Sequence, residues 1–170
     1  MWTEEADATA VWVSTMESTA LRELVADTDW GDLDFLLIDM PPGSDRIDNI
    51  RSLIPELAGV VEITIPSLLS QHIVSKSITK NNKMKVPIIG LIENMAGYTC
   101  PHCEKEGPLF EGDDVESLAK KKNIPYLGKI PFDTRIGRKT DSGSLYYMDN
   151  KDSVTGKAIC SVVGKILKSI

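Results

Sequence analysis

Short, nearly continuous apolar runs alternate along the chain with segments whose apolar residues recur every three or four positions. The runs are typical of strands covered on both faces of a parallel sheet, and the recurring spacing is typical of amphipathic helices. The pattern predicts strands at 35–40, 59–65, 86–92 and 124–130. It predicts helices near 15–27 and through the apolar positions of 47–57, 69–78, 115–122 and 154–167. Strands that alternate with helices indicate an α/β protein with a mainly parallel sheet and flanking helices.

One long irregular insert interrupts this alternation, from about residue 95 to residue 112. Loops of that length inside a compact domain are usually functional. The 170 residues contain no repeat, low-complexity tract or linker, so we expect a single domain over residues 1–170.

Composition and charge exclude several classes of function. The chain is 42% hydrophobic and 26% charged, as in ordinary globular proteins, and its net charge of −6 without a long basic run argues against nucleic acid as a partner. No apolar stretch approaches the roughly 20 residues of a membrane span, and the acidic N-terminus does not resemble a signal peptide. Three cysteines, an odd number, do not indicate a disulfide framework, so the expected location is cytoplasmic, in the reducing cytosol.

Cys100 and Cys103 lie three positions apart in the long insert, in the sequence Cys-Pro-His-Cys. Two thiols at this spacing fit a metal ion or one edge of a cluster, but also half of a structural zinc site, a redox pair or two ordinary thiols. Two thiolates leave a tetrahedral metal site half filled, and the third cysteine, Cys160, lies in the predicted 154–167 helix, where we expect a structural role. The simplest closure is a homodimer that brings four thiolates together across a two-fold axis.

Polar residues at the predicted strand ends form a second candidate site, because ligands of open α/β sheets bind at the carboxyl ends of the strands. Asp39 closes the first predicted strand, an arrangement in which a carboxylate holds the magnesium of a nucleoside triphosphate. Asp39 also fits a simple cap of the following turn. Pro41 and Gly43 come next, and Gly43 allows backbone amides to approach a phosphate.

Two further loops are expected at the same edge of the sheet. Asn94 follows the third predicted strand, and its amide is suited to a purine edge. Pro131 and Asp133 follow the fourth predicted strand, where the backbone is suited to border a base. Each of these two signals is weak when taken singly.

Four segments together resemble the Mrp family of iron–sulfur cluster carriers, which are P-loop ATPases related to MinD and to the nitrogenase iron protein. The segments are residues 30–43 (WGDLDFLLIDMPPG), residues 90–95 (GLIENM) followed by 100–103 (CPHC), residues 127–133 (LGKIPFD) and residues 141–143 (DSG). The resemblance covers most of the chain, from about residue 12 to residue 147.

The resemblance implies a homodimer in which Cys100 and Cys103 of each chain bind a bridging 4Fe–4S cluster, with apo iron–sulfur proteins as its recipients. In this family ATP binding is coupled to cluster loading or release. By position, Asp39 would serve magnesium, the segment from Pro41 to Gly43 the switch, and Asn94 with the 131–133 loop the adenine. The alternative that the cysteine pair leaves open is a zinc-bridged structural or interaction module without ATPase activity.

The chain departs from the family at the phosphate-binding loop. It contains neither G-x-x-x-x-G-K-[ST] nor the Lys-Gly-Gly variant of this family. The implied fold is therefore an incomplete P-loop NTPase fold that lacks its first βα unit, and we expect ATP and magnesium only where a complete P-loop is present. Either the chain is part of a longer protein or another chain supplies the missing part. Whether this chain is an enzyme stays open.

Overall fold

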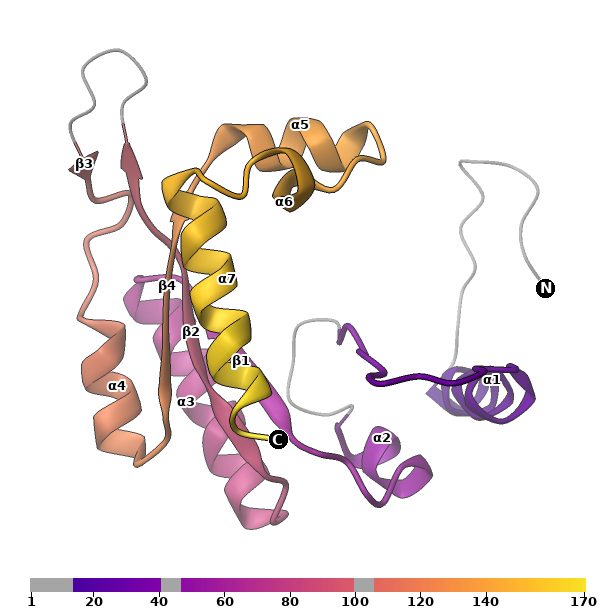
Figure 1. Cartoon of the computed structure of the whole chain (residues 1–170). Helices are drawn as coiled ribbons and strands as arrows, with labels where there is room; N and C mark the ends of the chain where they lie inside the picture. The colour runs from indigo at the N-terminus through magenta and orange to yellow at the C-terminus, as the bar shows by residue number, and fades with distance from the viewer. Residues whose placement is uncertain (1–13, 41–46, 100–105) are drawn as a thin grey trace. The chain divides into compact units, whose positions relative to one another are not determined.

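The computed structural model describes residues 14–40, 47–99 and 106–170 (Figure 1). Contacts along the chain divide it into two compact units, Met1–Glu56 and Leu57–Ile170. The expectation of a single domain over 1–170 stays a prediction. Within the described residues no helix has the length and apolar content that a membrane crossing requires.

The first unit contains two helices, α1 (Ser14–Asp27) and α2 (Ile47–Leu53). The bounds of α1 confirm the prediction at 15–27. A turn follows α1, in which the Asp29 carboxylate accepts a hydrogen bond from the Gly31 amide at 3.1 Å. Gly31 has a φ of +57°, a conformation that glycine adopts without steric cost.

The strand predicted at 35–40 is not a strand in the structure. Phe35 is exposed, and 90% of the Leu37 surface is accessible to solvent. A strand needs a neighbour to receive its backbone hydrogen bonds, and these residues have no strand partner within the described part of the chain. The prediction is therefore wrong, because an apolar run indicates only that the residues favour burial. It does not indicate whether a neighbouring strand is present.

The second unit is built on a sheet with three parallel strands. The middle strand, β2 (Ile88–Thr99), lies between β1 (Val60–Thr64) and β4 (Tyr126–Phe132), and both pairings are parallel. A two-residue strand, β3 (Glu106–Gly107), runs antiparallel to the last residues of β2. This arrangement confirms the predicted α/β class with a mainly parallel sheet.

Helices cover both faces of this sheet (Figure 1). On one face α3 (Leu68–Lys83) and α4 (Val115–Lys122) pack over a core centred on Leu91 of β2, while α7 (Val154–Leu167) packs on the other face over Ile92. Leu91 and Ile92 are consecutive and both buried, because successive side chains of a strand point to opposite faces. Burial on both faces explains the continuous apolar run in the sequence.

Several boundaries differ from the sequence prediction. β2 continues through Thr99, so the insert expected from residue 95 begins as a strand. β4 starts at Tyr126, two residues later than predicted, and extends through Phe132. Two unpredicted helices, α5 (Thr134–Asp141) and α6 (Tyr146–Asp149), connect β4 to α7. Because α5 buries none of its residues, its sequence has no apolar stripe that would indicate a helix.

Candidate functional site

The carboxyl ends of β2 and β4 bring together three of the residues predicted to bind nucleotide. Asn94 of β2 pairs with Ile130 of β4, so it lies close to Pro131, the next residue of β4. Asp133 follows directly after β4. The two strands therefore place Asn94 close to Pro131 and Asp133, as predicted, but Asn94 lies within β2 and Pro131 within β4, so neither lies in a loop as the sequence had indicated. Their binding role stays a prediction.

Asn94 begins a bulge in β2. Five residues of β2, from Asn94 to Tyr98, lie along only three residues of β4, from Ile130 to Phe132. Met95 has a φ of +53°, and its amide donates a hydrogen bond to the Asn94 side-chain oxygen at 2.9 Å. The Asn94 amide thus stabilises an unusual backbone conformation at a place where bulges commonly redirect a strand.

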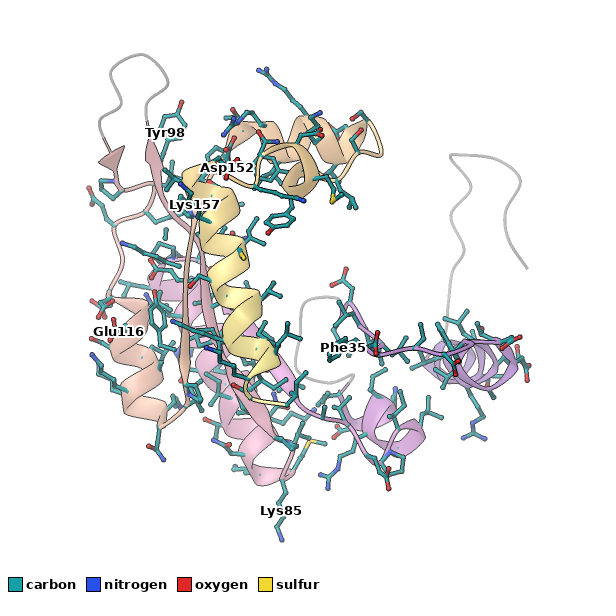
Figure 2. The ribbon with its side chains drawn as sticks, viewed as in Figure 1. Phe35, Lys85, Tyr98, Glu116, Asp152 and Lys157 are labelled. Carbon is teal, nitrogen blue, oxygen red and sulfur yellow. The ribbon has the colours of Figure 1, made fainter. Side chains whose placement is uncertain are left out.

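Beyond the bulge, β2 reaches the segment that carries the cysteine pair. The rings of Tyr98 and Phe132 lie 6.1 Å apart at an angle of 54°, which holds the end of β2 against the end of β4. On its other edge, Thr99 pairs with Glu106 of β3. Paired residues on antiparallel strands lie about 5 Å apart, so the six-residue connection 100–105 starts and ends at nearly the same place. Figure 2 shows Tyr98 near this end of β2.

The cysteine pair itself lies in that connection. Cys100 and Cys103 are outside the described residues, as are Pro41 and Gly43 of the predicted switch. Within the described ranges, no group of three or more His, Cys, Asp or Glu side chains is placed to hold a metal ion. Cys160 is exposed on α7. The roles predicted for these cysteines stay predictions.

The carboxylate of Asp133 is hydrogen-bonded and ion-paired to neighbouring residues of its own chain. Its carboxylate caps α5 by accepting from the Arg135 amide at 2.9 Å, and it forms an ion pair with the Arg135 guanidinium at 2.6 Å. The Tyr146 hydroxyl donates to the same carboxylate at 2.6 Å. The hydrogen bonds from Arg135, followed by the one from Tyr146, hold the pKa of Asp133 well below its usual range. The 131–133 loop is therefore fixed by its side chain, and its backbone remains the part suited to a ligand.

Arg135 and Tyr146 were not predicted from the sequence. Arg135 also donates to the Asn150 side chain at 3.1 Å, and its guanidinium lies 5.7 Å from the centre of the Tyr146 ring. Asp133 is of a residue type preferred at helix N-caps, but nothing in the sequence indicates that Arg135 pairs with it. Tyr146 carries no signal either, because it reaches Asp133 only through the fold.

A second polar pair near this edge was also missed. On β2, Glu93 accepts a hydrogen bond from the Tyr126 hydroxyl of β4 at 2.7 Å. Burial first, and then this bond to Glu93, raise the pKa of Tyr126. Asp39, by contrast, lies exposed in the first unit, outside any helix or strand.

Comparison with protein families gives one match over nearly the whole chain. The model of the ParA family described as "NUBPL iron-transfer P-loop NTPase" matches residues 1–167. An iron-sulfur cluster carrier protein of Saccharolobus solfataricus is 33% identical over 165 residues, which cover 96% of this chain and 56% of that protein. The cytosolic Fe-S cluster assembly factor NUBP2 of Bos taurus is 34% identical over 169 residues, covering 96% and 62%. The chain thus spans somewhat more than half the length of these relatives.

Solved structures agree on the fold. A nucleotide-binding protein of Archaeoglobus fulgidus, solved with ADP, aligns with a TM-score of 0.59 at 31% identity over 74% of this chain and 52% of that one. The cell division ATPase MinD of Pyrococcus furiosus aligns with a TM-score of 0.58 at 21% identity, over 90% and 57%. The second likeness shows the fold alone, and it confirms the predicted MinD-like P-loop NTPase architecture.

Proposed function

Because the chain belongs to the ParA-type family of NUBPL iron-transfer P-loop NTPases, we propose that it carries an iron–sulfur cluster and passes it to apo iron–sulfur proteins. Relatives from an archaeon and from cattle bear names for cluster carriage and cluster assembly. The cluster is the cargo of such a protein. The proposal therefore concerns how this chain holds its cargo and releases it.

The proposed ligands are Cys100 and Cys103 of two chains, which together bind one bridging 4Fe–4S cluster in a homodimer. The observation that carries this proposal is where the Cys-Pro-His-Cys sequence falls in the chain, directly after Thr99, the last residue of β2. The pairing of Thr99 with Glu106 gives both ends of the cysteine segment a fixed base on the sheet. Four thiolates are the usual ligand set of a 4Fe–4S cluster, and two chains supply that number.

We further propose that nucleotide binding belongs to the complete P-loop protein. There, Asp39 would hold magnesium, Pro41 and Gly43 would form the switch, and the adenine would lie between Asn94 and the 131–133 loop. This chain contains no P-loop sequence, so a complete P-loop must come from a longer form or from another chain. Support comes from β1, whose edge away from β2 has no strand partner within the described residues and whose Ile63 is 56% exposed.

The proposed compartment is the reducing cytosol. The odd number of cysteines fits a compartment in which thiols stay reduced. The name of the bovine relative describes that protein as cytosolic.

Metal analysis after anaerobic reconstitution tests the proposal. Wild-type chain is expected to give a brown dimer with about four iron ions per dimer, as a single 4Fe–4S cluster requires. Replacing Cys100 and Cys103 by alanine should remove the iron and the dimer. Cys160→Ala is the matched control and should keep both.

Two outcomes would refute the proposal. Full iron content in the Cys100→Ala, Cys103→Ala variant would show that the cluster has other ligands. Tightly held zinc without iron in anaerobically purified wild-type chain, with loss of the dimer on chelation, would establish the zinc-bridged module instead.

A further inference from the structure

The chain that leaves β3 passes over the turn between β1 and α3 at very close range. A Cβ atom added to Gly112 would lie 2.2 Å from the carbonyl oxygen and 2.6 Å from the carbonyl carbon of Pro66. It would also lie 3.0 Å from the Cα atom of Ser67. These are backbone atoms, which do not move aside as the end of a flexible side chain does. Glycine is therefore required at position 112 for a close backbone approach.

A buried side chain fixes the next residue of the same segment. Gln71, in the first turn of α3, is only 8% exposed, and its amide nitrogen donates to the carbonyl oxygen of Asp113 at 2.5 Å. The backbone of Gln71 is itself held by a hydrogen bond from its amide to the Ser67 carbonyl at 2.9 Å. A buried amide is retained at a cost unless it is hydrogen-bonded, so this contact explains why glutamine stands at a core position of α3.

These two contacts limit the position of β3. Only residues 108–111 separate Gly107 from Gly112, so the two Cα atoms lie at most about 17 Å apart. β3 pairs with β2 through two residues only, and so short a ladder is marginal by itself. The contacts at Gly112 and Asp113 therefore help to hold β3 beside Tyr98 and Thr99.

We propose that Gly112 and Gln71 are positioning residues for the cysteine segment, and we name the pair of contacts they make the 66–113 tether. The inference rests on the proposed function, because the segment 100–105 that β2 and β3 enclose carries the proposed cluster ligands. The tether joins this hairpin to the turn at Pro66, which follows the carboxyl end of β1, the edge where α/β sheets bind their ligands.

The first test uses the cluster-free chain and measures amide hydrogen exchange by mass spectrometry. Gly112→Ala and Gln71→Met should speed exchange in peptides covering 97–107 by roughly fivefold, the factor for one hydrogen bond of ordinary strength. Peptides covering 126–132 of β4 should exchange as in wild type. Gly137→Ala is the matched control, because a Cβ at the exposed Gly137 meets no atom within 4 Å.

The second test measures how fast reconstituted protein loses iron to a chelator. Both tether variants should lose iron several times faster than wild type and than Gly137→Ala, at unchanged initial iron content. Gln71→Met keeps the length of the side chain and serves as the milder variant if Gly112→Ala fails to fold.

The outcomes separate this inference from the proposed function. Exchange at 97–107 that stays at the control value, or that rises equally in 126–132, overturns the tether. Iron loss equal to that of Gly137→Ala in chain that holds its cluster overturns it as well. If wild-type chain binds no iron through its cysteines, the proposed function fails, while the exchange experiment on cluster-free chain still decides the tether.

Discussion

Glu62 offers a test of how the sheet and α3 are held together. Its side chain leaves β1 toward α3, and the residue is 9% exposed. The carboxylate accepts hydrogen bonds from the Ser77 hydroxyl at 2.9 Å and from the Asn81 amide at 2.7 Å. Burial raises the pKa of Glu62 above its ordinary value of 4.5, and the two hydrogen bonds oppose this rise.

The raised pKa fixes the direction of the pH dependence. The folded chain binds this proton more tightly than the unfolded chain, so the contribution of Glu62 to stability is complete below pH 4.5. It is lost as the pH rises through the folded-state pKa, because a buried carboxylate must then carry its charge. For one such group the free energy of unfolding falls by at most about 1.4 kcal/mol per pH unit within that window.

Glu62→Gln removes the charge and keeps an oxygen that accepts from Asn81. We expect the unfolding free energy of this variant, minus that of wild type, to have its lowest value near pH 4.5. The difference should shift in favour of the variant as the pH rises toward 8. Glu62→Ala also removes the acceptor. Because Asn81 is only 4% exposed, its unpaired donor should cost a further loss of about 1–3 kcal/mol relative to Glu62→Gln.

Urea unfolding followed by circular dichroism at several pH values between 4.5 and 8 measures both effects. Glu56→Gln makes the same chemical change at an exposed position and serves as the matched control. A constant difference between Glu62→Gln and wild type across this range, or one that moves against the variant with rising pH, would refute the reasoning.

Substitutions at two further positions test the polar contacts that cap the N-terminal ends of helices. Tyr146→Phe removes the hydroxyl that donates to Asp133, so urea unfolding at pH 7 should show a loss of about 1.5–3 kcal/mol. The loss should shrink only as the pH falls through the folded-state pKa of Asp133, which lies well below the ordinary 3.8, and a loss that persists once Asp133 is protonated would contradict this role. Asp114→Ala removes the cap that accepts from the Ser117 amide at 3.1 Å and should cost about 1 kcal/mol in thermal unfolding, whereas Asp114→Asn, which retains an acceptor, should cost less. Equal losses for the two Asp114 variants would argue against capping.

The parts of the fold predicted correctly are those in which local sequence and burial agree. β2 was predicted because its residues are covered on both faces, as Leu91 and Ile92 show. The helix predicted at 115–122 is α4, and Asp114 caps its start. In each case the residues that determine the element lie within it or directly beside it.

The candidate site was predictable in its residues but not in its contacts. The sequence identified Asn94 and Asp133 as residues at strand ends, and Asp133 does follow β4 directly, whereas β2 continues past Asn94 to Thr99. It did not reveal that Asp133 is bound by Tyr146, or that Asn94 holds Met95 in a left-handed conformation. These contacts depend on a bulge and on two short helices that have no apolar periodicity, so no sequence pattern predicts them.

The failure at 35–40 has a different cause, which also bears on the proposed function. An apolar run predicts a strand on the assumption that a neighbour exists, yet Phe35 and Leu37 are exposed in the first unit, and Ile63 is exposed on the β1 edge of the second. Fully burying one such side chain stabilises a protein by about 1.5–3 kcal/mol, and since these three are 54%, 90% and 56% exposed, they leave roughly 3–6 kcal/mol of stabilisation unrealised in the described chain. These exposed residues fit the proposal of a larger sheet in the complete protein, in which a strand would pair with the edge of β1 that has no strand partner within the described residues. A parallel strand added from a longer form or from another chain should therefore raise the stability of the second unit by covering the β1 edge, and it would also supply the setting in which a P-loop binds nucleotide.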